Sequence, residues 1–128
     1  MTRKIFAVSL MLVVAAMFAF AQDKAAQPVK LTGYLIDGMC AAEGDGEAVA
    51  ETAKGHPTAC SLMPSCAAKG FALVVDTKVY KFDEAGNKAA HAVLKATKAV
   101  KGLRVEVEGT LDGQTLRATK VSEVKAAE

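Results

Sequence analysis

The chain has 128 residues, of which 52% are hydrophobic and 23% are charged, and its formal net charge is +2. That charge depends on the N-terminus: without Arg3 and Lys4, fourteen basic side chains remain against fourteen acidic ones. A near-neutral chain lacks the electrostatic attraction that DNA, RNA and anionic lipids exert on basic proteins, so we expect no nucleic-acid partner. Its length suits a single domain.

Residues 1–21 are typical of a secretory signal peptide. A short basic start precedes an apolar run over residues 5–20, and Ala19-Phe20-Ala21 fits the small-x-small cleavage rule. The alternative is a membrane anchor, but a run of about 16 residues is shorter than the roughly 20 that span a bilayer. We therefore predict cleavage before Gln22, no transmembrane segment after cleavage, and a periplasmic or secreted product.

Residues 22–28 are polar, rich in alanine and end in a proline, which predicts a flexible lead-in to one domain over residues 29–125. In the first part of that domain, hydrophobic alternation or a continuous apolar run predicts strands over 29–36, 71–75 and 79–82. Along the first of these strands, Leu31 and Leu35 share one face and Tyr34 and Ile36 the other. Gly33 indicates a bend or a bulge in this strand.

After a predicted turn over residues 83–87, the hydrophobic period changes from two to 3.6. One face of the predicted helix then carries Ala90, Val93, Leu94, Thr97 and Val100, and the opposite face carries Lys88, His91, Lys95 and Lys98. His91 is therefore expected to be exposed, and Gly102 stands where a helix C-cap is expected.

Two further strands are predicted beyond this helix. Alternation begins at Leu103, and Asp112-Gly113 is a strong hairpin turn before a last strand over 114–124. In that last strand Val121 is out of phase with Leu116, which predicts a bulge near Thr119 or Lys120.

Five strands with a helix between the third and the fourth is the element order of the OB-fold, a partly open Greek-key barrel. We therefore expect a mainly β, OB-like barrel of five strands, with one amphipathic helix and a partly helical, cysteine-bearing insertion over residues 37–70. A five-stranded sheet with one helix packed across it would produce the same order of elements.

The insertion contains every cysteine of the chain. Its candidate ligands are Cys40, His56, Cys60, Met63 and Cys66. Thiolate, thioether and imidazole groups select soft or borderline metals, so copper and zinc are the candidate ions. His56 and Cys60 are four residues apart and would share one face of a helix, although Pro64 disfavours helix at Met63.

Three interpretations of this cluster stay open. Cys40, Cys60 and Cys66 can supply a structural disulfide, as small secreted domains often do. Together with His56 and Met63 they can bind a metal, although their spacing matches no usual zinc pattern. A thiol redox role for Cys60 or Cys66 is the third, and it lacks a C-x-x-C motif.

The remaining candidates favour structural roles. Met39 and Met63 are more often core fillers than copper ligands. Asp37, next to Gly38, is typical of a turn former at the end of the first strand. The only nucleophile with a base is Cys60 with His56, for which no third group is visible, so we expect no enzyme activity.

Four segments of the chain carry a resemblance to known proteins. Their sequences are GYLID at 33–37, HPTACSLMPSC at 56–66, KVYKF at 78–82 and VEVEGTLDG at 105–113. Together they resemble a group of small secreted bacterial proteins of uncharacterised function, which share a signal peptide, an early cysteine, a His-x3-Cys-x2-Met-Pro-x-Cys stretch and a terminal hairpin. The resemblance implies a secreted β-rich domain whose Cys and His positions belong together, and it implies no catalytic residue.

The function predicted from the sequence is that of a small secreted binding module. Its partner would be a small ligand, a metal ion or a protein, bound at or near the Cys/His insertion. A structural envelope protein without a small ligand is the alternative that involves no site chemistry.

Overall fold

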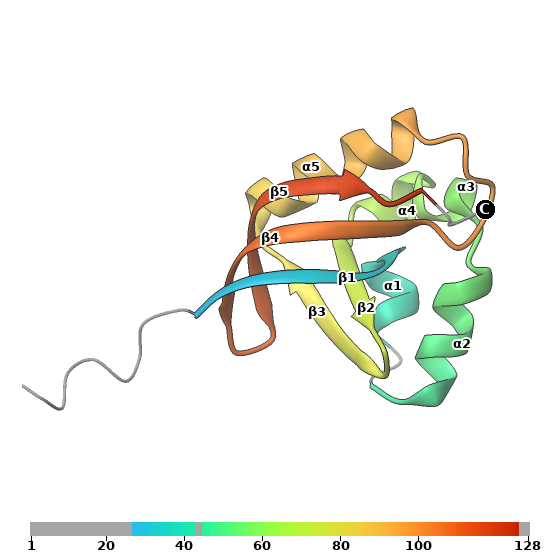
Figure 1. Ribbon diagram of the computed structural model, residues 1–128. Helices are drawn as coiled ribbons and strands as arrows, with labels where there is room; N and C mark the ends of the chain where they lie inside the picture. The colour runs from blue at the N-terminus through green and yellow to red at the C-terminus, as the bar shows by residue number, and fades with distance from the viewer. Residues whose placement is uncertain (1–26, 43–44, 126–128) are drawn as a thin grey trace, which may run out of the picture.

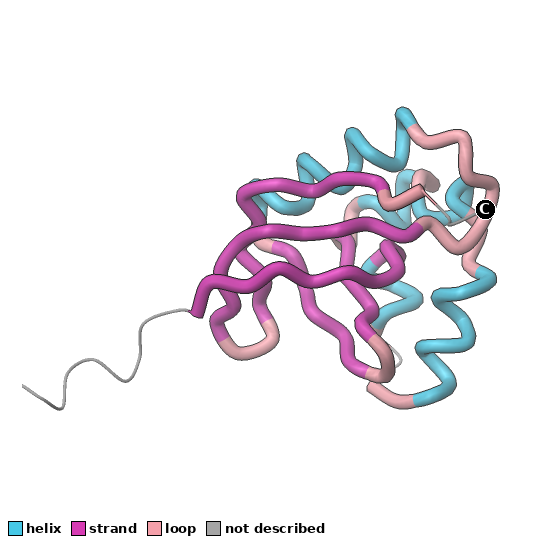
Figure 2. Tube along the Cα trace, viewed as in Figure 1, coloured by secondary structure: helices cyan, strands magenta, loops and turns pink. Residues whose placement is uncertain are grey.

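The computed structural model of the protein describes residues 27–42 and 45–125. The described strands are β1 (Gln27–Asp37), β2 (Phe71–Val75), β3 (Lys78–Phe82), β4 (Arg104–Asp112) and β5 (Thr115–Glu123). The described helices are α1 (Gly38–Ala41), α2 (Glu47–Gly55), α3 (Thr58–Ser61), α4 (Pro64–Ala67) and α5 (Glu84–Ala96). The chain is thus mainly β with several helices (Figures 1 and 2). The predicted signal peptide lies outside the described residues.

The five strands form a mixed sheet whose pairing closes on itself in the order β1-β2-β3-β5-β4. β1 is the longest strand and pairs antiparallel with two neighbours, with β4 from Gln27 to Tyr34 and with β2 from Tyr34 to Asp37. Parallel pairing of β3 with β5 completes the ring. The end of β1 is therefore held in place by the sheet, and it is where the insertion begins.

Two apolar clusters cover the two faces of the strands. One joins α5 to one strand face and contains Leu35, Phe71, Leu73, Phe82, Ala90, Leu94, Leu103, Val105, Val107 and Leu116. The other joins α1 and α2 to the opposite face and contains Ile36, Ala41, Val49, Ala53, Ala72, Val74 and Val79. Because helices cover both faces, β2 is buried on both sides along most of its length, as its continuous apolar run predicts.

Several strand predictions are confirmed. Leu35 and Ile36 lie in different clusters, as the predicted faces of the first strand require. The register between β4 and β5 shifts at Glu108, which pairs with Lys120 while Gly109 pairs with Ala118, so Thr119 is the extra residue of the predicted bulge. β1 begins at Gln27, two residues earlier than predicted, because pairing with β4 extends into the expected lead-in.

The predicted helix needs correction at both ends. It begins at Glu84, because Asp83 caps it by accepting a hydrogen bond from the Gly86 N–H, so the expected turn is its first turn. It ends at Ala96, and Val100 is 79% exposed. His91 is half-buried and stacks on Phe71, with ring centroids 6.0 Å apart, so its predicted exposure is wrong.

A separate contact explains the early end of α5. Residues 99–102 pair with the insertion: Pro57 bridges Lys101, and the Thr58 N–H donates to the Val100 carbonyl at 3.0 Å. Gly102 adopts φ +60° there, and a Cβ on it would lie 2.4 Å from the Lys54 carbonyl oxygen. Gly102 is therefore required at this contact, and is not the helix C-cap that the sequence suggested.

Among the described residues, no helix has both the length and the apolar character needed to cross a membrane.

Gly33 marks a close approach of two strands, and the register shows no bulge at this residue. A Cβ on Gly33 would lie 2.3 Å from the backbone oxygen of Val74, which cannot move away without disturbing the pairing of β1 with β2. We expect Gly33→Ala to lower the free energy of unfolding by about 1–3 kcal/mol in urea denaturation, the usual range for overpacking.

Gly55→Ala is the matched control for that substitution. Gly55 ends α2, and a Cβ on it would have no atom within 4 Å. We expect an unchanged or slightly higher free energy of unfolding, because alanine favours helix. Equal losses in the two variants would contradict a steric role for Gly33.

Candidate functional site

The site is built on Asp37, the last residue of β1 and the N-cap of α1. Its Oδ1 accepts a hydrogen bond from the backbone N–H of Cys40 at 2.9 Å, three residues along the chain. This is the usual N-cap arrangement, in which a side-chain oxygen satisfies a donor of the first helical turn. The cap places the Cys40 side chain in the turn that follows the carboxylate.

His56 reaches the same carboxylate from the other side of the insertion. It is the C-cap of α2 and has an extended conformation, and its carbonyl oxygen accepts a hydrogen bond from the Gly102 N–H at 3.0 Å. Two residues further on, the Thr58 hydroxyl donates to the Ala99 carbonyl at 2.8 Å. The backbone on both sides of His56 is therefore fixed by the segment before β4, which aims the imidazole at the end of β1.

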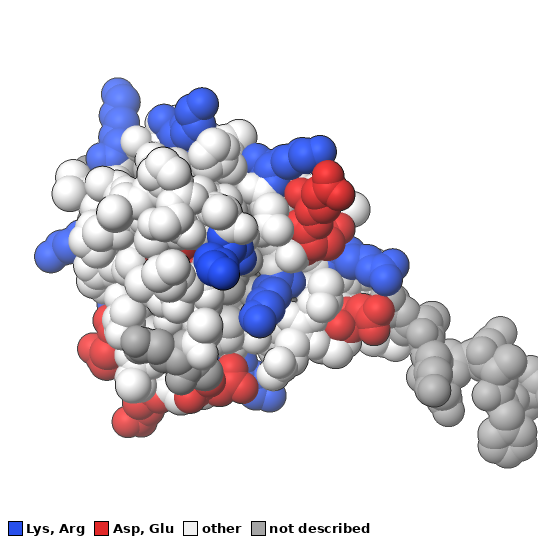
Figure 3. Space-filling view, turned by 180° about the vertical axis from the view of Figure 1, so that it is seen from behind, with Lys and Arg blue, Asp and Glu red and all other residues white. Residues whose placement is uncertain are grey.

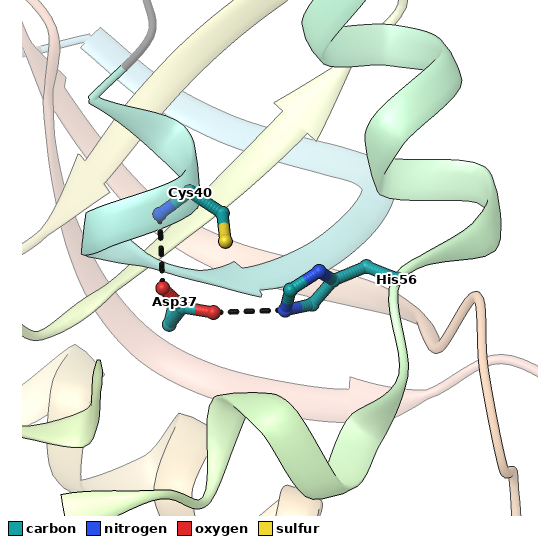
Figure 4. A group of neighbouring side chains, drawn as sticks. All are labelled: Asp37, Cys40 and His56. Carbon is teal, nitrogen blue, oxygen red and sulfur yellow. Dashed lines mark hydrogen bonds and ion pairs between the residues drawn. The ribbon is translucent and has the colours of Figure 1, made fainter. Parts of the chain in front are cut away.

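Asp37, Cys40 and His56 form one cluster (Figure 4). One carboxylate oxygen, the thiol sulfur and one imidazole nitrogen all lie within 4.8 Å of one another. The Nε2 of His56 is 2.8 Å from the Oδ2 of Asp37. Asp37 is 0% exposed and His56 is 9% exposed, whereas Cys40 is half-buried and packs against the apolar cluster of α1 and α2.

The electrostatics of the cluster favour an ionised carboxylate. Burial by itself raises the pKa of Asp37. The hydrogen bond from the Cys40 N–H and the hydrogen bond and charge of His56 lower the pKa, and together they outweigh burial, so the pKa falls below the ordinary value of 3.8. The Ser61 hydroxyl is a third, longer contact, 3.5 Å from Oδ2. A buried anion surrounded by donors is thus available at neutral pH.

The other candidates from the sequence are not members of this cluster. Cys60 is half-buried in α3, and Cys66 is half-buried in α4. No disulfide joins any of the three cysteines, all of which are described. Met39 is 46% exposed and Met63 is 52% exposed, so the expectation that they fill the core is wrong.

The helical conformation is interrupted at His56 and Pro57, between α2 and α3. The expectation that His56 and Cys60 share one face of a helix is therefore wrong. Pro57 is extended and caps α3, so the two residues share no helix. A second break comes where expected, because α3 ends at Ser61 and Pro64 opens α4. His56 is therefore brought to Cys40 by tertiary contacts, and its spacing from Cys60 has no part in it.

Asp37 is the site residue that the sequence-based interpretation missed. It was expected to form a turn, and it does end β1, but it is also the fully buried centre of the cluster. Two signals could have indicated this. Asp37 follows three apolar or aromatic residues of a two-sided strand, and it stands three residues before a cysteine, at N-cap spacing.

Charge on the molecular surface is mixed. On the face shown in Figure 3, basic and acidic side chains are interspersed, and broad uncharged areas lie between them.

Comparisons of the chain with protein-family models, curated proteins and solved structures gave no match. The chemistry of the site is therefore inferred from its own residues.

Asp37→Asn tests the charge at the centre of the cluster. The folded protein lowers the pKa of Asp37, so the stabilisation is present above pH 3.8 and is lost as the pH falls through the folded-state pKa. We expect the variant to lose about 1–3 kcal/mol of unfolding free energy at pH 7. We also expect a flatter dependence of that free energy on pH below 4, measured by urea denaturation from pH 7 to 2.

Asp112→Asn is the control, since Asp112 is exposed and its contact with Arg117 at 3.4 Å lies on the surface. Its pH profile should follow that of the unmodified protein. If Asp37→Asn also follows that profile, the buried carboxylate does not carry the acid sensitivity.

Proposed function

We propose that this protein is a small secreted or periplasmic binding module of OB-like architecture, and that Asp37, Cys40 and His56 bind one transition-metal ion. Copper and zinc are the candidate ions. The observation that supports the proposal most directly is the convergence of three different donor groups within 4.8 Å at the buried end of β1.

The OB-like assignment is supported by the topology. The strand order β1-β2-β3-β5-β4, the parallel β3-β5 pair and a helix between β3 and β4 agree with a five-stranded Greek-key barrel. The secreted location is supported by the basic start, apolar run and cleavage rule of residues 1–21.

The donor set favours a borderline ion. A thiolate excludes the hard cations calcium and magnesium, which take oxygen ligands. Thiolate and imidazole together suit zinc and copper, and a carboxylate oxygen completes a mixed set that zinc accepts. Three protein ligands leave a fourth position for water or a small ligand, as in metal centres that exchange a ligand.

Binding of a metal ion would displace protons from the ligand side chains. The hydrogen bond between Oδ2 of Asp37 and Nε2 of His56 would open, and the Cys40 thiol would release its proton. Ligand atoms around a tetrahedral ion lie about 3.3–3.7 Å apart, given bonds of 2.0–2.3 Å. The two atoms must therefore separate from 2.8 Å, a small movement for side chains whose backbones are held from outside the cluster.

A second candidate function uses the same residues without a metal. A histidine held by a carboxylate and lying beside a cysteine is the arrangement that activates a thiol. The 2.8 Å contact between His56 and Asp37 favours Cys40 for this role over Cys60 or Cys66, the thiols considered from the sequence. Rapid alkylation of Cys40 in a protein that binds no metal would support this candidate.

Cobalt(II) titration of the reduced protein tests the metal proposal, because a cobalt–thiolate bond gives a charge-transfer absorption band. We expect one equivalent to bind, with protons released in proportion. Cys40→Ser should remove the band, and His56→Gln and Asp37→Asn should each weaken binding by at least about tenfold, the effect of losing a charged contact.

Cys60→Ser and Cys66→Ser are matched controls, since both residues are half-buried cysteines of the insertion outside the cluster. Both variants should retain the band. A band that survives Cys40→Ser and disappears with either control would place the metal elsewhere. Denaturing mass spectrometry after alkylation counts thiols, and Cys40 found in a disulfide in the mature protein would contradict the proposal.

A further inference from the structure

A cleft of about 670 Å³ lies between α2 and the sheet, and no residue of the Asp37–Cys40–His56 cluster lines it. Sites for small molecules commonly enclose roughly 300–1,000 Å³. The cleft arises from the strand pairing. β1 pairs with β2 only from Tyr34 onward, so the two strands separate before that residue, and α2 lies along the gap.

Arg104 and Tyr34 form one wall of the cleft. The Arg104 guanidinium carbon lies 5.9 Å from the centre of the Tyr34 ring. A guanidinium held over an aromatic face keeps its in-plane N–H donors free for a carboxylate. Within residues 27–42 and 45–125, no carboxylate forms an ion pair with Arg104.

The other wall is acidic. Glu47, Glu51 and Asp76 line the cleft together with Lys54. Lys54 is already paired with Glu51 at 2.6 Å, and this hydrogen bond is the main reason that the pKa of Lys54 is raised. Glu47 and Asp76 have no ion pair among the described part of the chain. Among the described residues that line it, the cleft therefore has Arg104 on the basic side and Glu47 and Asp76 on the acidic side without an ion pair, and the charge of Lys54 also acts on Glu47.

This charge pattern selects the class of ligand. A simple anion would meet Arg104 but also two unpaired carboxylates, and a simple cation would leave Arg104 unpaired. A molecule with a carboxylate at one end and an ammonium at the other satisfies both walls. Thr32 and Thr77 also line the cleft, and their hydroxyls can donate and accept hydrogen bonds.

We propose that this cleft binds a zwitterion of the amino acid or short-peptide class, with its carboxylate on Arg104 and its ammonium toward Glu47 and Asp76. The binding uses no residue of the Asp37–Cys40–His56 cluster. It is therefore independent of the metal proposal and can be tested on the metal-free protein.

Three related probes separate the two charged contacts. Diglycine carries both termini, N-acetyl-diglycine lacks the ammonium, and diglycine amide lacks the carboxylate. Each is titrated at pH 7 into the isotope-labelled protein, and the backbone amide signals of the cleft residues are followed by NMR. We expect diglycine to bind at least about tenfold more tightly than either capped probe, the usual effect of one charged hydrogen bond.

Arg104→Gln identifies the carboxylate partner. Arg104 is exposed, so its replacement leaves the apolar clusters intact. The variant should bind diglycine as weakly as it binds diglycine amide, and its affinity for the amide should be unchanged. Arg117→Gln is the control, since Arg117 is an exposed arginine of β5 outside the cleft. It should bind all three probes as the unmodified protein does.

Two outcomes would overturn the proposal. One is equal affinity for the three probes, and the other is no shift of the Tyr34, Lys54 or Arg104 signals at the solubility limit of diglycine. Loss of discrimination in Arg117→Gln as well as in Arg104→Gln would show a general charge effect and would also overturn it.

Discussion

The insertion between β1 and β2 depends on one buried carboxylate. Asp37 accepts hydrogen bonds from the first turn after β1 and from an imidazole nineteen residues away, so a single side chain joins α1 to the end of α2. A buried carboxylate without partners is strongly unfavourable, whereas a carboxylate surrounded by donors stabilises the arrangement that surrounds it. No disulfide contributes to this joint among the described residues. Metal binding would use the same joint and replace its protons.

The strands could be predicted because their pattern is local. Period-two alternation and continuous apolar runs reflect which faces are buried, and both faces of β2 are buried because separate helices cover them. The bulge at Thr119 was also visible, since one extra residue reverses the phase of every residue that follows. The end of α5 could not be predicted from the sequence. Val100 continues the helical pattern, but its carbonyl oxygen pairs with Thr58, a contact between segments 42 residues apart in the chain.

For the candidate site too, part could be predicted from the sequence and part could not. Cysteine and histidine are informative residue types, so Cys40 and His56 could be selected from the sequence, together with Cys60, Cys66 and Met63. Which of these side chains lie close together depends on the end of the helical conformation before Pro57 and on the pairing of residues 56–58 with 99–102. Neither can be predicted from the spacing of the residues in the sequence. Asp37 escaped notice because an aspartate before a glycine is usual in turns, and only burial distinguishes it from an ordinary turn residue.

The two sites share a helix. Glu47, Glu51 and Lys54 of α2 line the charged cleft, and His56, whose imidazole is held by Asp37, directly follows the same helix. Val49 and Ala53 fasten α2 to the sheet on its apolar side, while Gly102 contacts the carbonyls of Lys54 and His56 at its end. A short helix held at its end and along one face has a fixed position relative to the sheet, because closely packed contacts leave little free volume. The geometry of the cleft and that of the Asp37–Cys40–His56 cluster therefore depend on the same few contacts at the end of α2.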